Sequence, residues 1–383
     1  MKRDFSTLSP RILIAPDKFK GSMTAHEISS ILKSEIEKVI PSANVSYSPL
    51  ADGGDGSIEI LAKHLNLEII RVKTIDPLGR GLETIYYKKD DTAYIELASS
   101  SGLVLLNEEE RNPFKTSTYG TGLEMKHAIE NGLDHIYLFL GGSATNDGGI
   151  GIASALGYTF LGNGGIELPP VGESLSLIRT IIPSPIVDTL KSLTLCCDVN
   201  NPPTGVNGAA SIYAQQKGAS KEDIEILDHG MVNLCNQIKM FNYKEVINLV
   251  GGGAAGGVPV CLVGLLGSTI VSGVDLIIKL LNLEDEIENS DFVISGEGRL
   301  DKQSLNGKVV SGVARLCKKY KKPLYLTVGK NELDQKSVKD LGVKQIFEIM
   351  SHAEDIDDAM ENGSYYLSKI GREIAQQICS RNL

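Results

Sequence analysis

The residues of this chain that could do chemistry lie mainly in glycine-bearing loops. Five such loops follow apolar segments and together carry carboxylates, two basic residues and short polar side chains: Asp17, Lys20, Asp52, Asp55, Ser143, Thr145, Asn146, Asp198, Glu297, Arg299 and Asp301. Carboxylates hold hard cations such as Mg²⁺, whereas basic side chains and the amides of glycine-rich turns bind anions. This combination favours phosphoryl transfer, because that reaction needs charge neutralisation, a metal and a positioned hydroxyl more than a covalent nucleophile.

The chain is organised around the glycine-rich segment 141–149. This segment reads Gly-Gly-Ser-Ala-Thr-Asn-Asp-Gly-Gly, follows an apolar run over 136–140 and precedes a helix-like apolar stretch to residue 156. A buried strand, a glycine turn and a helix in that order present backbone N–H groups to an anion at the helix N-terminus. We therefore expect an anion site, with an ordinary tight turn as the alternative. Its candidate residues are Gly141, Gly142, Ser143, Thr145 and Asn146.

The first strand–loop–helix unit of the chain contains a charged pair. Residues 12–15 predict a short strand, and Asp17 and Lys20 lie in the loop that follows it. A helix is expected after Thr24, because Glu27 three residues later completes a capping box. α/β proteins bind their ligands in loops of this kind. A solvated surface lysine is the alternative for Lys20.

A second unit repeats this pattern. Residues 45–50 predict a strand, Asp52 and Asp55 bracket two glycines, and a helix is expected over 58–65. The two aspartates suggest Mg²⁺ or a substrate hydroxyl as ligand. A plain Asp–Gly turn is the alternative.

Two later strand ends also carry acidic residues. Asp198 follows the apolar run 193–197 beside a proline turn, where a metal ligand, a base and an Asx turn are all compatible with the pattern. Residues 291–295 predict a further strand. The loop expected over 296–301 holds Glu297, Arg299 and Asp301.

Alternation of strands and helices predicts an α/β fold in two domains. Residues 1–66 and 286–383 read as β–α repeats, which we expect to form one discontinuous domain around a Rossmann-like parallel sheet. Short β-rich runs begin at residue 67, so residues 67–285 are expected to form a second α/β domain inserted into the first.

A second glycine cluster suggests a different activity. Residues 251–257 contain a literal G-x-G-x-x-G after strand-like residues 246–250, which alone would favour an NAD(P)-dependent oxidoreductase. Pro259 early in the expected helix and the lack of a well-placed acidic partner weaken that interpretation. The same region, residues 246–274, is uncharged and as long as a membrane span, but eight glycines interrupt it. We expect a strand, a glycine turn and a buried helix there.

Composition restricts the partners and the compartment. The formal net charge of −10 argues against a general nucleic-acid binder, whose affinity depends on phosphate neutralisation. The six cysteines show no CxxC spacing, which fits a reducing, cytoplasmic environment, and the N-terminus lacks the apolar core of a signal peptide. We expect a small-molecule substrate, no membrane and no nucleic-acid partner. A homo-oligomer is left open.

Several catalytic motifs are absent from the sequence. There is no HExxH, no GxSxG and no cysteine–histidine arrangement for nucleophilic catalysis. The Gly307-Lys308 pair does not belong to a Walker A motif, because no glycine stands five residues before it and Val309 replaces the Ser or Thr. The chain is therefore not expected to be a P-loop kinase.

Seven segments of the sequence, taken in order, resemble those of the bacterial class I glycerate kinases. They are residues 15–22, 51–56, 141–149, 197–202, 216–220, 253–257 and 295–304. The resemblance spans nearly the whole chain and implies ATP- and Mg²⁺-dependent phosphorylation of D-glycerate to 2-phosphoglycerate. It also implies two α/β domains with the active site in the cleft between them.

The chemistry of the candidate residues suggests a role for each in such a kinase. Lys20 and Arg299 would bind the substrate carboxylate or the transferring phosphoryl group. Asp17 or Asp52 would orient or deprotonate the acceptor hydroxyl. ATP phosphates would lie against Gly141, Gly142, Ser143, Thr145 and Asn146, and Mg²⁺ would be held by Asp198, Glu297 or Asp301.

The sequence departs from the family pattern at a few positions. Lys18 stands where Ser is usual, Asp55 where Glu is usual, and Gly252 lengthens a glycine motif. Because Lys18 could add charge near the acceptor, the choice among small hydroxy acids is less defined than the reaction type. A non-catalytic protein that binds a small anion is the second alternative, beside the oxidoreductase.

Overall fold

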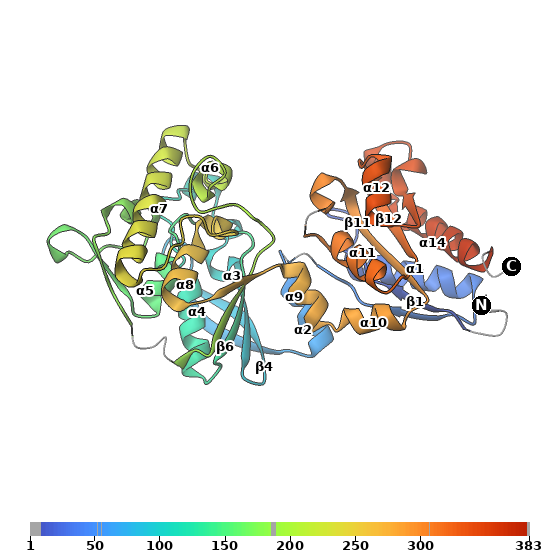
Figure 1. Cartoon of the computed structure of the whole chain (residues 1–383), viewed down its shortest axis with the longest axis horizontal. Helices are drawn as coiled ribbons and strands as arrows, with labels where there is room; N and C mark the ends of the chain where they lie inside the picture. The colour runs from blue at the N-terminus through green and yellow to red at the C-terminus, as the bar shows by residue number, and fades with distance from the viewer. Residues whose placement is uncertain (1–8, 52, 55, 185–188, 306, 381–383) are drawn as a thin grey trace. The chain divides into compact units, whose positions relative to one another are not determined.

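The computed structural model describes residues 9–51, 53–54, 56–184, 189–305 and 307–380 of the 383-residue chain. The protein has the expected α/β fold and divides into two compact units, whose elements are labelled in Figure 1. Unit 1 comprises the chain up to residue 52 and from residue 274 onward, and unit 2 comprises residues 53–273. The N-terminal and C-terminal segments therefore build one unit together.

This division differs from the predicted boundaries at residues 66 and 285. Helix α2 (Ser57–Leu65) packs against strand β5 (Thr92–Glu96) and belongs to unit 2. The second predicted boundary passes through helix α10 (Leu283–Asn289), which packs against α11 (Val309–Lys319) and β1 (Arg11–Ile14) of unit 1. Packing partners that are distant in sequence thus decide to which unit each segment belongs.

Unit 1 is built on a five-stranded parallel sheet with the strand order β13-β12-β11-β1-β2. Beside β1, its strands are β2 (Asn44–Tyr47), β11 (Phe292–Leu300), β12 (Leu324–Asn331) and β13 (Gln345–Glu348). Ile12 of β1 pairs with Val45 on one side and with Phe292 on the other. The chain first adds β2 to one side of β1 and later fills the other side. The topological switch point of this doubly wound sheet therefore lies between β1 and β11.

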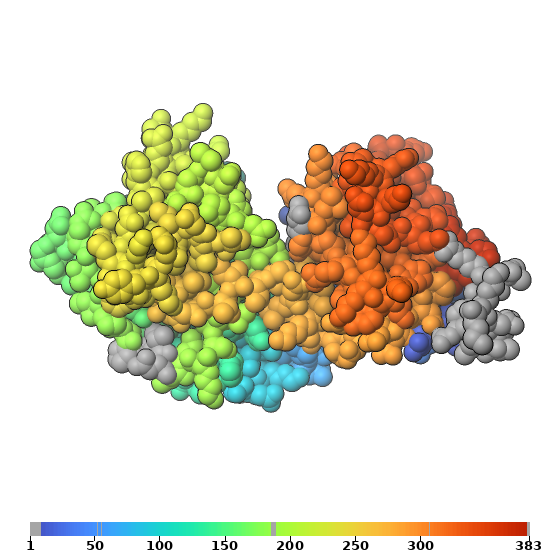
Figure 2. Space-filling model, in the orientation of Figure 1, coloured from blue at the N-terminus to red at the C-terminus, as the bar shows by residue number. Residues whose placement is uncertain are grey.

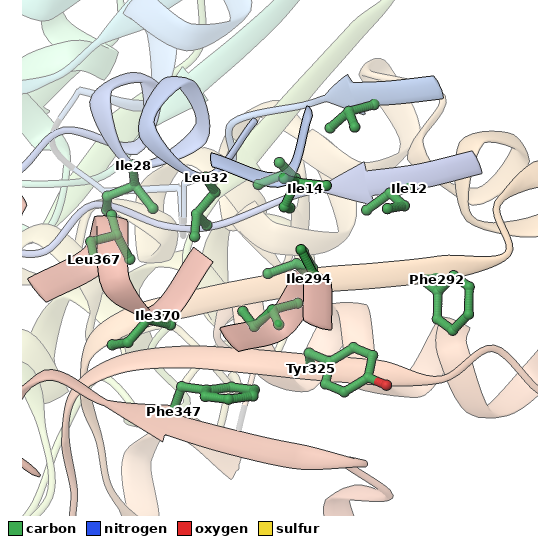
Figure 3. Close-up of a cluster of buried hydrophobic side chains, with 14 of the residues drawn as sticks. Ile12, Ile14, Ile28, Leu32, Phe292, Ile294, Tyr325, Phe347, Leu367 and Ile370 are labelled. Atoms are coloured by element: carbon green, nitrogen blue, oxygen red, sulfur yellow. The ribbon is translucent and has the colours of Figure 1, made fainter. Parts of the chain in front are cut away.

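Helices α1 (Ala25–Val39) and α14 (Gly363–Ser380) pack together over one face of this sheet. The predicted capping box begins α1: the Thr24 hydroxyl accepts from the Glu27 amide at 3.2 Å, and the Glu27 carboxylate accepts from the Thr24 amide at 2.8 Å. Figure 3 shows the core that these helices form with the strands, in which Ile28, Leu32, Leu367 and Ile370 pack with Ile12, Ile14, Ile294, Tyr325 and Phe347. Each fully buried aliphatic side chain of this kind stabilises the fold by about 1.5–3 kcal/mol.

The opposite face of the sheet is covered as well. Leu13 and Val293 alternate with the residues of the core just described, and both are fully buried. Helix α11 packs against strand β11. Burial on both faces explains why these strands read as nearly continuous apolar runs. The remaining helices of unit 1 are α9 (Gly273–Leu280), α12 (Gln335–Leu341) and α13 (Ile356–Glu361).

Unit 2 contains a six-stranded mixed sheet with the order β10-β9-β6-β5-β4-β3. Its strands, besides β5, are β3 (Glu68–Ile75), β4 (Gly81–Lys89), β6 (His135–Phe139), β9 (Ser192–Cys196) and β10 (Thr269–Val271). The pairs β3–β4 and β4–β5 are antiparallel, whereas β5, β6, β9 and β10 run parallel. A short hairpin of β7 (Thr159–Leu161) and β8 (Thr180–Ile182) lies outside this sheet.

The helices of unit 2 include one long element that the sequence interpretation did not include. Helix α7 (Lys221–Asn242) spans 22 residues and begins with a capping box at Ser220. It buries Met231, Leu234 and Ile238 at helical spacing, while its other side forms part of the surface, coloured yellow in Figure 2. The other helices are α3 (Ala98–Ser101), α4 (Tyr119–Glu130), α5 (Ile150–Ala155), α6 (Ala209–Tyr213) and α8 (Val258–Leu266).

Two local predictions were wrong. Residues 246–250 form loop and turn rather than a strand, and residues 296–300 continue strand β11 rather than forming a loop. The second segment is extended because β12 pairs with it along its whole length, for example Arg299 with Lys330. The buried helix expected after the glycine cluster is α8, only nine residues long, and no described helix has the length and apolar character needed to cross a membrane.

Candidate active site

A cavity of about 620 Å³ opens at the carboxyl ends of the parallel strands of unit 1. It is lined by the segment after β1, by the end of β11, by the end of β12 and by residues around α13. Five predicted site residues line it: Asp17, Lys20, Glu297, Arg299 and Asp301. Lys18 lies there too. The cavity therefore occupies the switch point at which doubly wound proteins bind ligands.

Backbone pairing places Asp17 beside the end of β11. The chain continues extended after β1, and the Asp17 amide donates to the Gly296 carbonyl oxygen at 2.8 Å. The turn that follows packs directly on Gly298, where a Cβ atom would lie 3.3 Å from Phe19 Cα and 3.4 Å from the Lys20 nitrogen. A side chain at position 298 would push this turn away, so glycine there allows Asp17 and Lys20 to approach the acidic end of β11.

Glu297 is the most deeply buried charged residue of this group, with 6% of its surface exposed. Its Oε1 atom has no hydrogen-bond partner among the described residues. Burial raises the pKa of Glu297 to about 7; the charges of Asp17 and Asp301 act in the same direction, while Ser304 and Lys308 oppose the shift. A buried carboxylate among other carboxylates favours a proton or a cation as its partner.

Arg299 and Asp301 are held by neighbouring groups. The Arg299 Nε and Nη2 atoms both donate to Glu332 Oε2, at 2.9 and 2.6 Å. Asp301 Oδ1 accepts from the Gln303 amide at 2.7 Å, which closes a turn. Arg299 Nε lies 3.9 Å from Asp301 Oδ2. One oxygen of Asp301 is therefore used in a turn, and the whole group forms a charged wall of the cavity.

The other wall of the cavity is apolar, which the sequence interpretation missed. It consists of Ile349, Met350, Ile356, Ala359 and Met360. Ile356 is 62% exposed and Met360 is 42% exposed. Sequence reasoning also missed the basic residues Lys308 and Lys330 on the charged wall, although the Gly307-Lys308 pair had been noted. A cavity lined by both charged and apolar side chains suits a ligand that has both charged and apolar parts.

The glycine-rich loop between β6 and α5 belongs to unit 2. Gly142 is exposed and has φ +63°, and Ser143 is 8% exposed. Thr145 and Asn146 are fully buried, and the Thr145 hydroxyl and both polar atoms of the Asn146 amide lack partners among the described residues. Of the predicted anion-binding residues, Gly141, Gly142 and Ser143 thus lie at or near the surface, and the other two lie beneath it.

The N-terminus of α5 is not open to a ligand, which corrects the argument from the helix start. Asp147 is fully buried there, and its carboxylate accepts from the amides of Gly149 at 3.1 Å and Gly151 at 3.3 Å. It also accepts from the Thr118 amide and hydroxyl, at 2.8 and 2.7 Å, where α4 begins. Burial raises the pKa of Asp147, and these hydrogen bonds oppose the shift. The anion at this helix start is therefore the chain's own carboxylate.

Asp198 lies in the loop after β9 in unit 2. Its Oδ1 atom accepts from the Gly273 amide at 2.9 Å and from the Ser272 hydroxyl at 3.3 Å. A Cβ atom on Gly53 would lie 2.9 Å from Asp198 Oδ2, so the glycine allows this close approach. Asp52 and Asp55, the predicted ligands of Mg²⁺ or of a substrate hydroxyl in the loop that contains Gly53, lie outside the described residues.

The glycine cluster 251–257 has a packing role in unit 2. A Cβ atom on Gly256 would lie 1.9 Å from the Thr145 carbonyl oxygen and 2.8 Å from Asn146 Cα. The Gly148 amide donates to the Gly256 carbonyl oxygen at 3.1 Å. The cluster thus supports the 141–149 loop from below. Residues 243–250, directly before the cluster, form loop and turn rather than a strand. The dinucleotide-binding arrangement expected from the motif is therefore not formed.

These features define a doubly wound α/β protein with a charged ligand cavity at its switch point. The glycerate kinase family model matches residues 12–379, and the chain belongs to this family. It is 38% identical over 368 residues to a protein named glycerate kinase from Halalkalibacterium halodurans, covering 95% of this chain and 97% of that protein. It is 36% identical over 369 residues to glycerate 2-kinase from Escherichia coli, with the same coverage.

A solved structure agrees with this assignment. The crystal structure of a Salmonella typhimurium LT2 protein, solved under the name glycerate kinase 2, matches with a TM-score of 0.85 and 33% sequence identity. The match covers 98% of this chain and all of the other. Both the fold class and the family predicted from the sequence are therefore confirmed.

Proposed function

We propose that this chain transfers the γ-phosphoryl group of ATP to the 2-hydroxyl group of D-glycerate. The observation that carries the proposal is the cavity of unit 1, in which acidic and basic residues of a glycerate kinase family member line the switch point of the sheet. Phosphoryl transfer depends on positioning and on charge neutralisation, and both can be supplied by such a wall.

Asp17 and Lys20 would act on the transferring group or its acceptor. Asp17 would orient the glycerate hydroxyl or accept its proton, because backbone pairing holds its main chain at the end of β11 and the Lys18 amide donates to its Oδ1 atom at 2.7 Å. Lys20 is exposed on the cavity wall, and Arg299 is held there by Glu332. These two cations would neutralise the glycerate carboxylate or the phosphoryl oxygens.

Residues of unit 2 would take further roles. Gly141 and Gly142 would offer amides at the surface for ATP phosphates, and Ser143 would offer its hydroxyl from just beneath it. Thr145 and Asn146 would support that loop from beneath, since their side chains are buried. Asp52 would share the role proposed for Asp17.

The carboxylates fit the Mg²⁺ that kinases of this kind use. Glu297 presents a buried oxygen without a described partner, and Asp301 has one oxygen outside its turn. Asp198 would be the third candidate ligand. Such hard oxygen donors suit Mg²⁺. Mg²⁺ held by these residues would supply neutralisation of the negative charge of the ATP phosphates.

Release of ADP tests the proposal. The assay would measure ADP formed from ATP and Mg²⁺ with D-glycerate, with L-glycerate and without acceptor, and phosphorus NMR would locate the phosphate on the product. We expect D-glycerate-dependent ADP and a 2-phosphate resonance. No acceptor-dependent ADP, with ATP binding retained in calorimetry, would instead favour the anion-binding alternative.

Two variants connect this assay to the site. Asp17→Asn and Asp52→Asn should each lower kcat by at least about 10²-fold with the fold retained, because general-base catalysis contributes that much. Asp357→Asn, an exposed position on α13, is the matched control. Wild-type turnover in either site variant, with an intact circular dichroism spectrum, would remove that residue from the mechanism.

A further inference from the structure

Lys217 of unit 2 is a buried lysine that the proposed mechanism leaves unused. Only 2% of its surface is exposed, and none of the described carboxylates forms an ion pair with it. Its ammonium nitrogen donates instead to the Ser143 hydroxyl oxygen and to the Thr145 carbonyl oxygen, each at 2.7 Å. Fully buried lysines without a paired charge are rare in proteins, because desolvation of the ammonium group is unfavourable.

The local backbone holds Lys217 firmly beneath the glycine-rich loop. Lys217 ends a short 3₁₀ turn, and Gly218 follows with φ +96°. A Cβ atom at position 218 would lie 2.1 Å from the Arg111 carbonyl oxygen, so only glycine fits there. Ser220 then caps α7. This explains the Gln-Lys-Gly-Ala-Ser segment noted in the sequence: each residue around Lys217 serves to direct it inward.

The hydrogen bond to Ser143 has a defined polarity. When Lys217 is protonated, its ammonium group has three donors and no acceptor, so the Ser143 oxygen must accept. The hydroxyl hydrogen of Ser143 is then available for another acceptor. Ser143 follows the exposed Gly142, at the place where the loop reaches the surface. A serine polarised by a buried cation is a strong donor to an anionic oxygen.

The electrostatic surroundings of Lys217 make its charge sensitive to pH near neutrality. Burial lowers the pKa of the Lys217 amine to about 7, and the charge of Asp147, in the same loop as Ser143, opposes the shift. Cys261 of α8 in turn faces Asp147. The buried Thr145 hydroxyl and Asn146 amide beside Lys217 lack described partners, and each such group is unfavourable by about 1–3 kcal/mol in a purely structural core.

We propose that Lys217 is a positioning residue that makes Ser143 a committed hydrogen-bond donor to an anionic oxygen of a substrate. The ligand group is a phosphate or a carboxylate. The molecule that carries this phosphate or carboxylate would be ATP or glycerate, and this part of the inference rests on the proposed function. Lys217 itself does not reach the substrate; it acts through the Ser143 hydroxyl and the Thr145 carbonyl.

Calorimetric titration of variants tests this role. The variants are Lys217→Met, Ser143→Ala and the double variant, with Lys221→Met at the exposed start of α7 as the matched control. Each protein is titrated with tripolyphosphate, with a non-hydrolysable ATP analogue and with D-glycerate. We expect Lys217→Met and Ser143→Ala each to weaken binding of one anion class at least 10-fold, and the double variant to be no weaker than the singles. The affected class identifies the source of the anion.

Three results would overturn the proposal. One is binding by folded Lys217→Met within twofold of wild type for all three ligands. A second is an additive double variant, which would mean that the two residues act independently. The third is a wild-type affinity that stays constant from pH 6 to pH 9, because deprotonation of Lys217 in this range should weaken the bound anion class and Ser143→Ala should flatten that profile. The pH profile of the wild type tests the proposal even if Lys217→Met does not fold.

Failure of the proposed function gives a different result. If no D-glycerate-dependent ADP forms but tripolyphosphate binding still depends on Lys217, the positioning role stands and the substrate assignment falls. If ADP forms normally in Lys217→Met with unchanged KM, the positioning role falls and the substrate assignment stands.

Discussion

A buried carboxylate in unit 2 leads to a quantitative prediction of pH-dependent stability. Glu124 of α4 has no exposed surface. Burial raises its pKa from 4.5 to about 8; the Glu96 charge acts in the same direction, and Ser100 opposes it. The nearby Tyr86 is buried too, and burial together with the Glu124 charge raises the Tyr86 pKa to about 12. The folded state therefore retains a proton on Glu124 at pH values at which the unfolded chain has lost it.

The sign and size of the effect follow from linkage. Because the folded state retains the Glu124 proton that the unfolded state loses, the contribution of Glu124 to stability is most favourable below pH 4.5 and declines as the pH rises toward the folded pKa. Each pKa unit corresponds to about 1.4 kcal/mol, so the loss is about 3 kcal/mol at pH 7 and about 5 kcal/mol above pH 8. Glu124→Gln removes the titration, and its stability relative to wild type should rise by these amounts between pH 4.5 and pH 8.

Urea unfolding of wild type and Glu124→Gln at pH 5, 6, 7 and 8 measures this difference. Glu130→Gln, at the exposed end of the same helix, is the control and should show no such trend. The absolute offset at pH 5 depends on how well the new amide finds partners, so the slope with pH is the deciding quantity. A difference between wild type and Glu124→Gln that is constant with pH would refute the reasoning.

Two further predictions concern the site itself. Mg²⁺ should raise the thermal midpoint of the wild type in the presence of ATP, and Glu297→Gln should remove most of that increase, since the buried Glu297 oxygen is a candidate ligand; an unchanged increase in differential scanning fluorimetry would exclude Glu297 as a ligand. Gly256→Ala should lower the free energy of unfolding by at least about 3 kcal/mol, because its Cβ would meet the Thr145 carbonyl and its φ is +71°. Gly164→Ala has the same φ but open space around it, so a loss of about 1 kcal/mol is expected there, and equal losses in the two variants would contradict the packing role of Gly256.

Much of unit 1 could be predicted because its signals are local. The capping box of Thr24 and Glu27 lies within one helical turn, and the apolar spacing of α1 continues directly from it. The strands of a doubly wound sheet are short apolar runs, so β1, β12 and β13 were recognisable in the sequence. The rule that ligands bind at the carboxyl ends of such strands then indicates Asp17 and Glu297 as candidate site residues from the sequence alone.

The predictions failed where a residue depends on partners far along the chain. Residues 296–300 looked like a glycine loop and became a strand, because β12 supplies the hydrogen bonds. The Gly251–Gly257 motif looked like a dinucleotide loop, although its close contact with Thr145 explains its glycines. The sequence did not predict the apolar wall of the cavity, because Ile356 and Met360 belong to a helical segment that carries no recognisable motif.

The sequence by itself determined the family, the α/β class and the set of charged segments, because the spacing of nearby residues and the order of the motifs indicate those features. Only the tertiary structure decided which of these groups line the cavity of unit 1 and which are enclosed in the fold. Asp147 occupies the helix start that seemed open, since Thr118 reaches it from another helix. Lys217 is directed at Ser143 across 74 positions of sequence. Such buried long-range hydrogen bonds depend on packing that removes water from both partners, and no local pattern in the sequence predicts that packing.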